Sequence, residues 1–115
     1  MYKKFRSTYS KEHRLNEFKQ LTIKYPKRIP IVIDLESKDL VLNKRKYLAE
    51  SEMLFCQFQH VIRQQMNIGP NDSLFFFYGW TIPCPTHSLA QIYKQHPTED
   101  GFMVIKVAKE NTFGV

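Results

Sequence analysis

The reactive side chains of this 115-residue chain are few, and their spacing limits the chemistry that they can do. Cys84 precedes His87 by three positions in "IPCPTH", and these are the residue types of a nucleophile and its base. Catalytic partners of this kind are neighbours in the fold and seldom in the sequence, and prolines on both sides of Cys84 indicate a loop thiol. We therefore expect no catalytic residue and no enzymatic activity.

Metal and cofactor sites are not expected either. The histidines and cysteines lack the spacing of metal ligands; they are His13, His60, His87, His96, Cys56 and Cys84. The four glycines form neither a phosphate-binding loop nor a dinucleotide fingerprint. Two cysteines far apart in sequence make a disulfide framework improbable and fit a reducing compartment.

The sequence closes on "ENTFGV", in which a single residue, Val115, follows Gly114. Chain ends fray and glycine tolerates fraying, so six residues alone assign no purpose to this glycine. The rest of the chain has the size of one domain with a core that needs no disulfide or metal. Its longest apolar run, "LFFFY", is far shorter than a bilayer-spanning helix, and no apolar signal segment follows Met1, so we expect a soluble intracellular protein.

The net charge of +6 is concentrated at the N-terminal end. Residues 1–28 carry nine Lys or Arg against two Glu, whereas residues 29–115 sum to −1. Such a field suits acidic peptides, phosphate backbones or anionic lipid headgroups. A solvated helix face explains the same lysines, and the charge alone does not rank these alternatives.

Hydrophobic spacing predicts the elements that position these residues. A helix is expected between a cap at Ser10 and Pro26, after a shorter helix, and a second long helix from Ser51 to about residue 66. Strands are expected at 28–35, 46–49, 73–78 and 102–107, with a short helix within 86–96. Pro30 favours an edge position or an irregular start for the first strand, and the aromatic run at 74–78 favours a fully buried third one. This α+β order permits a ubiquitin-like β-grasp in which the last strand lies between the first and third.

Several segments in this order resemble a known family. They are "KYPKRIPIVID", "KRKYL", "QFQHVIR", "LFFFY", "QIYKQHPTEDGF" and the terminal "ENTFGV". Together they resemble the autophagy ubiquitin-like modifiers, the family of light chain three and the GABA-receptor-associated protein, over the whole chain. The resemblance implies a single domain, 1–115, with a helical extension at 1–25 containing two helices that ubiquitin lacks, a β-grasp at 28–108 and a flexible tail at 109–115.

The resemblance gives the terminal glycine a use. A cysteine protease would remove Val115, with Phe113 as its aromatic anchor, and expose Gly114. An activating and a conjugating enzyme would then join Gly114 to phosphatidylethanolamine, moving the protein from the cytoplasm to the autophagosome membrane. Glycine lacks Cβ, so it fits a narrow catalytic cleft and leaves its carbonyl open to attack. The chain would be a substrate and a tag.

The resemblance also implies a groove for receptors that carry an aromatic-x-x-aliphatic motif and add as a strand beside residues 46–49. The aromatic pocket would comprise Glu17, Leu21, Pro30, Lys46, Leu48 and Phe102. The aliphatic pocket would comprise Tyr47, Ala49, Met53, Phe58, Val61 and Gln65. Arg28, Lys44 and Arg45 would meet acidic residues that flank the motif.

The sequence departs from the pattern of this family at several positions. Gln65 replaces an arginine, Ala49 is smaller than the usual valine, Glu50 adds a negative charge, and Trp80 occupies a turn that is normally polar. Two alternatives stay open at this point. One is a ubiquitin-like adaptor that is never conjugated, and the other is a basic nucleic-acid-binding module whose affinity falls steeply with salt.

Overall fold

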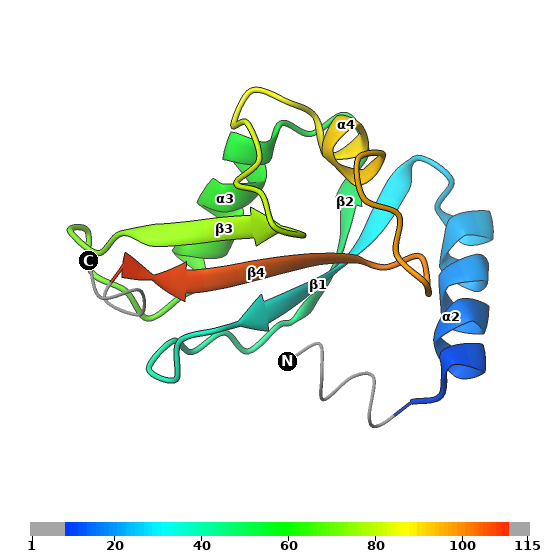
Figure 1. Cartoon of the computed structure of the whole chain (residues 1–115), viewed down its shortest axis with the longest axis horizontal. Coiled ribbons are helices and arrows are strands. Elements are labelled where there is room, and N and C mark those ends of the chain that lie inside the picture. The colour runs from blue at the N-terminus through cyan, green and yellow to red at the C-terminus, as the bar shows by residue number, and fades with distance from the viewer. Residues whose placement is uncertain (1–8, 111–115) are drawn as a thin grey trace.

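The computed structural model describes residues 9–110, which form one four-stranded mixed sheet with its helices packed around it (Figure 1). In chain order the elements are α2 (Lys11–Lys24), β1 (Arg28–Leu35), β2 (Lys46–Glu50), α3 (Phe55–Gln64), β3 (Leu74–Tyr78), α4 (Leu89–Tyr93) and β4 (Met103–Lys109). The strand order is β2-β1-β4-β3, with β4 parallel to β1 and antiparallel to β3. The last strand therefore lies between the first and third, as predicted, and the α+β fold class is confirmed.

The two faces of the sheet are covered by different helices. Alternate residues of β1 point in opposite directions, so Ile31 and Ile33 pack into the main core beneath α3, while Val32 faces the other way. Val32 packs against Phe102 and, on α2, against Phe18 and Leu21. Figure 1 shows α2 standing across the end of the sheet where β1 begins, with α3 behind the sheet.

Helix α2 has the predicted start and end. The Ser10 side chain accepts a hydrogen bond from the His13 N–H at 3.1 Å, and the helix stops at Lys24, shortly before Pro26. The shorter helix expected before it lies outside the described residues. Within residues 9–110, none of the helices combines the length and apolar character needed to cross a bilayer.

The expectation that Pro30 marks a sheet edge is wrong, because β1 is an interior strand. The Ile33 N–H donates to the Arg45 carbonyl, so the odd-numbered residues of β1 exchange hydrogen bonds with β2. Pro30, an even position, turns its nitrogen to the other side, where pairing with β4 begins one residue later at Ile31. A proline fits there because no ladder bond needs its missing N–H.

Other features of the elements also differ from the predictions. Helix α3 begins at Phe55 and not at Ser51, whose N–H instead donates to the Lys27 carbonyl and closes the β1–β2 pairing. Strand β3 is an edge strand and not a fully buried one, since Phe76 and Tyr78 are buried while the alternate phenylalanines are half-buried. Strand β4 includes Lys109, which the domain prediction assigned to the tail.

Candidate functional site

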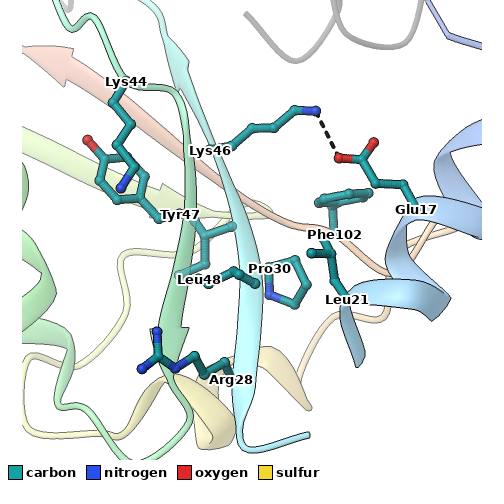
Figure 2. A pocket seen from close by; sticks show the side chains of 10 residues that line it. Glu17, Leu21, Arg28, Pro30, Lys44, Lys46, Tyr47, Leu48 and Phe102 are labelled. Atoms are coloured by element: carbon teal, nitrogen blue, oxygen red, sulfur yellow. Dashed lines mark hydrogen bonds and ion pairs between the residues drawn. The ribbon is translucent and has the colours of Figure 1, made fainter. Parts of the chain in front are cut away.

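A cavity of about 390 Å³ lies between α2 and the β1–β2 hairpin. All six residues predicted for the aromatic pocket line it, namely Glu17, Leu21, Pro30, Lys46, Leu48 and Phe102, together with Arg28, Ile31, Lys44 and Tyr47. In Figure 2, Leu21 and Phe102 lie on the side of α2, and Pro30 and Leu48 face them from the two strands. Most of this lining is apolar, so the cavity can take a large apolar side chain.

Charged groups lie at both ends of the cavity, with Lys44, Lys46 and Glu17 at one end and Arg28 at the other (Figure 2). The Lys46 ammonium donates to Glu17 Oε1 at 3.0 Å, which links β2 to α2 across the opening (Figure 2). The Lys44 ammonium lies 4.8 Å from the centre of the Tyr47 ring, and Arg28 lines the same cavity from the start of β1. Three cations against one carboxylate give this opening a positive potential that favours an acidic partner.

Strand β2 lies at the edge of the sheet and has a row of backbone groups on its outer side. The Arg45 carbonyl accepts from the Ile33 N–H of β1 at 2.8 Å, and the Ser51 N–H donates to the carbonyl of Lys27, just before β1, at 2.9 Å. The backbone groups of the odd-numbered residues of β2 therefore face β1. The peptide groups of Leu48 consequently point away from β1. An edge of this kind can accept an added peptide strand.

The residues predicted for the aliphatic pocket lie on the opposite face of β2, toward α3. They are Tyr47, Ala49 and Phe58, which are buried, Met53 and Val61, which are half-buried, and Gln65, which is exposed. The Tyr47 and Phe58 rings meet edge to face at 5.9 Å, and the Tyr47 hydroxyl donates to Gln65 Oε1 at 3.0 Å. Burial raises the pKa of Tyr47, which keeps this hydroxyl protonated as the donor. Gln65 therefore holds the hydroxyl end of the Tyr47 side chain.

Arg45 differs from the other predicted basic residues. Its Nε donates to the Leu42 carbonyl at 2.5 Å, which turns the side chain back onto the preceding loop. It does not line the cavity, whereas Arg28 and Lys44 do. Trp80 is 94 % exposed, with the Lys106 ammonium 5.7 Å from its ring, and lies at the end of β3, the edge of the sheet opposite to β2.

Buried contacts that no sequence pattern indicated hold Phe102 in the cavity. Arg14 of α2 is buried, and its Nη1 lies 2.6 Å from Asp100 Oδ2, while Asp100 Oδ1 accepts from the Phe102 N–H at 3.0 Å. Gly101, between them, has φ +88°, and a Cβ there would lie 2.4 Å from the Phe18 ring. In the sequence, Arg14 stands at a helical position beside the apolar residues of α2. A charged residue at such a position is seldom buried without a partner, and this is the signal that could have indicated one for Arg14.

Phe113, Gly114 and Val115 lie outside the described residues, so the structure leaves their predicted roles untested. The Cys84 sulfur lies 3.2 Å from the Thr86 hydroxyl, and the His87 N–H donates to the Cys84 carbonyl at 3.1 Å. In the part of the chain that the structure describes, no three His, Cys, Asp or Glu side chains are grouped so as to hold a metal ion.

Comparison with known proteins agrees with this geometry. A family model described as "Autophagy protein Atg8 ubiquitin like" matches residues 13–114. The chain belongs to the Atg8 family. This Atg8-family chain is 34% identical, over 116 aligned positions, to Autophagy-related protein 8 of Schizosaccharomyces pombe, covering 99% of this chain and 96% of the relative. It is also 34% identical to the protein of the same name from Vanderwaltozyma polyspora, covering 99% and 98%.

Solved structures give the same result for the fold. Trypanosoma brucei ATG8 superimposes with a TM-score of 0.84 at 26% identity, covering 93% of this chain and 94% of that one. Plasmodium falciparum Atg8, solved in complex with a P. falciparum Atg3 peptide, superimposes with a TM-score of 0.80 at 24% identity, covering 91% and 97%. The resemblance stated from the sequence, to the ubiquitin-like proteins of autophagy, is confirmed.

Proposed function

We propose that this chain is a ubiquitin-like modifier of autophagy that is trimmed after Gly114, conjugated to phosphatidylethanolamine and used to recruit motif-bearing receptors. It would act in the cytoplasm and, once conjugated, on the autophagosome membrane. It would be a substrate and a tag, without enzymatic activity or cofactor. Its partners would be a processing cysteine protease, activating and conjugating enzymes, and receptors or adaptors, with no nucleic acid.

One observation carries the receptor-binding part of the proposal. Six residues chosen from four separate segments of the sequence line a single cavity, and that cavity lies beside the outer edge of β2. A bound peptide would place its aromatic side chain in the cavity and its backbone along Leu48. The side chain three positions later would contact the opposite face, where Tyr47 and Ala49 lie.

The spacing of the motif fits an added strand. Successive side chains of a strand alternate between its two faces, so two anchors three residues apart point in opposite directions. The α2 face of β2 offers the cavity to the first anchor, and the α3 face offers the predicted aliphatic pocket to the second. Burying each anchor contributes about 1.5 to 3 kcal/mol, and pairing of the peptide backbone with β2 adds to this. Ordering the peptide offsets much of the gain, so we expect an affinity of about 1 μM, which is about −8 kcal/mol.

The conjugation part of the proposal is supported by family membership and by the family match, which extends to Gly114. Two acyl chains of the attached lipid would hold the protein stably on a membrane, because each buried CH₂ contributes about 0.8 kcal/mol. The Atg3 peptide in the P. falciparum complex supports a conjugating enzyme of that kind as a partner of this chain.

Leu48→Ala tests the groove, because Leu48 is half-buried and lines the cavity without entering the main core. We expect a peptide with the sequence Glu-Glu-Trp-Ala-Ala-Ile to bind about tenfold more weakly in calorimetric titration, a loss of about 1.4 kcal/mol. Ile23→Ala is the matched control, since Ile23 is 81% exposed on α2 and does not line the cavity. Equal affinities of the wild type and Leu48→Ala would refute binding in this cavity.

Gly114→Ala tests conjugation, with the intact mass of the cellular protein as the measurement. We expect the wild type to lose Val115 and gain the lipid, and the variant to show neither change. A lipid-bearing Gly114→Ala variant would contradict the assigned attachment site. Peptide binding by a wild-type protein that never carries lipid would instead support the unconjugated adaptor.

A further inference from the structure

A second cavity, of about 300 Å³, lies where β1 begins and β2 ends. It is lined by Lys27, Arg28, Glu50, Ser51 and Glu52, and it shares Arg28 with the aromatic cavity. The two cavities therefore follow one another along the β1–β2 hairpin. None of the residues predicted from the sequence for the aromatic or the aliphatic pocket belongs to this second cavity, and Arg28 is its one residue that was predicted to meet flanking acidic residues.

The positions of the two anchors set the direction of a bound peptide. The aromatic cavity is lined by β2 from Lys46 to Leu48, and the predicted aliphatic pocket includes Ala49 and Met53, further along the chain. A motif whose aromatic residue comes first must therefore run parallel to β2. The residues that follow the motif then reach the end of β2, where the second cavity lies.

Alternation along the peptide decides which of its side chains enters. The aromatic residue points to the α2 face, the aliphatic residue three positions later to the α3 face, and the next residue returns to the α2 face. Glu50 is on that α2 face, because it lies two positions after Leu48 and opposite Arg28 in the β1–β2 register. The side chain immediately after the aliphatic residue consequently lies over the second cavity.

The charges differ between the two cavities. Three cations and one carboxylate line the aromatic cavity, whereas two of each line the second one. Within the second cavity the carboxylates, Glu50 and Glu52, belong to β2 and the turn after it, next to the added strand. Lys27 lies just before β1 and Arg28 is its first residue, one strand further away at a spacing of about 4.8 Å. The Arg28 guanidinium also lies 5.8 Å from the Tyr25 ring.

We propose that the second cavity is a specificity subsite, in which Glu50 and Glu52 select a lysine or arginine immediately after the aliphatic residue of a bound motif. This inference rests on the proposed function, since it needs a peptide on β2. Preferred partners would be acidic before the aromatic residue and basic after the aliphatic one. A peptide of that pattern would match the charge of the groove along its whole length.

The test compares peptides that differ at one position. The series is Glu-Glu-Trp-Ala-Ala-Ile-X-Ala-Ala with Lys, Ala or Glu at X, and a fourth peptide carries Lys one position later, where the side chain points to the α3 face. We expect the Lys peptide to bind about tenfold more tightly than the Glu peptide in calorimetric titration at low salt. The shifted Lys should behave like Ala, and 1 M salt should shrink the tenfold ratio because the screening length falls to about 3 Å.

Variants of the protein complete the test. The Glu50→Gln, Glu52→Gln double variant should bind the Lys and Glu peptides with affinities within about twofold of each other. Glu110→Gln is the control, because Glu110 is exposed and lines neither cavity, and it should keep the wild-type ratio. Equal binding of the Lys and Glu peptides by the wild type, with Leu48→Ala still weakening both, would overturn the subsite and leave the groove standing. Failure of every peptide to bind would overturn the groove and the subsite together.

Discussion

Replacing Asp100 by asparagine should lower the stability of the fold while leaving Phe102 in place in the aromatic cavity. Asp100 is fully buried, and its Oδ2 lies 2.6 Å from Nη1 of Arg14, whose side chain is 5% exposed. Asparagine keeps an oxygen that can accept from the Phe102 N–H, but it removes the charge that faces the guanidinium. The variant therefore separates the buried ion pair from the contact that positions Phe102.

The magnitude follows from the burial of both partners. Breaking a buried pair by removing one charge costs about 3 to 5 kcal/mol, because the other charge stays in a medium of low polarity. With an unfolding entropy of about 2.1 cal/mol/K per residue, a 115-residue chain loses about 4 °C of Tm per kcal/mol, so Tm should fall by about 12 °C or more. Glu99 lies 3.6 Å from Arg14 and is 39% exposed, so its contribution is below about 1 kcal/mol.

Thermal unfolding followed by circular dichroism, together with calorimetric peptide titration, measures both effects. Asp100→Asn should lower Tm and keep the peptide affinity, while Asp100→Ala, which also loses the acceptor for Phe102, should lower both. Glu99→Gln is the control. If Asp100→Asn changes Tm by no more than Glu99→Gln does, the buried pair does not fasten α2, and the reasoning fails.

Two other predictions use features outside the groove. Gly101→Ala should destabilise the fold by about 2 to 4 kcal/mol in denaturant unfolding, because φ is +88° there and a Cβ would meet the Phe18 ring at 2.4 Å; an unchanged midpoint would contradict this. The hydrogen bond with Thr86 lowers the pKa of Cys84, so more of this thiol is ionised at neutral pH, and Thr86→Val should slow its alkylation by iodoacetamide, measured by peptide mass mapping at pH 7. Equal alkylation rates in the wild type and the variant would show that Thr86 has no such influence.

Local patterns in the sequence predicted the elements that depend on neighbouring residues. The Ser10 cap and the stop before Pro26 fix α2, and the alternation of isoleucines fixes β1, because each signal acts within one or two turns of chain. The predicted start of α3 was wrong because the local signal at Ser51 competes with a contact that is distant in sequence. Ser51 is a good cap by residue type, but its N–H donates to the Lys27 carbonyl and continues the β1–β2 pairing. Helix α3 begins only after that pairing ends.

The sequence by itself determined the order of elements and, through the resemblance to a family, the six residues of the aromatic cavity. Only the tertiary structure decided that Pro30 is tolerated inside the sheet, that Arg45 turns away from the groove, and that Arg14 is buried against Asp100. Each of these depends on which strand or loop lies beside the residue. The sequence pattern shows that Arg14 is charged. The partner that makes its burial favourable, Asp100, lies 86 positions away in the sequence, so only the folded chain brings the two together.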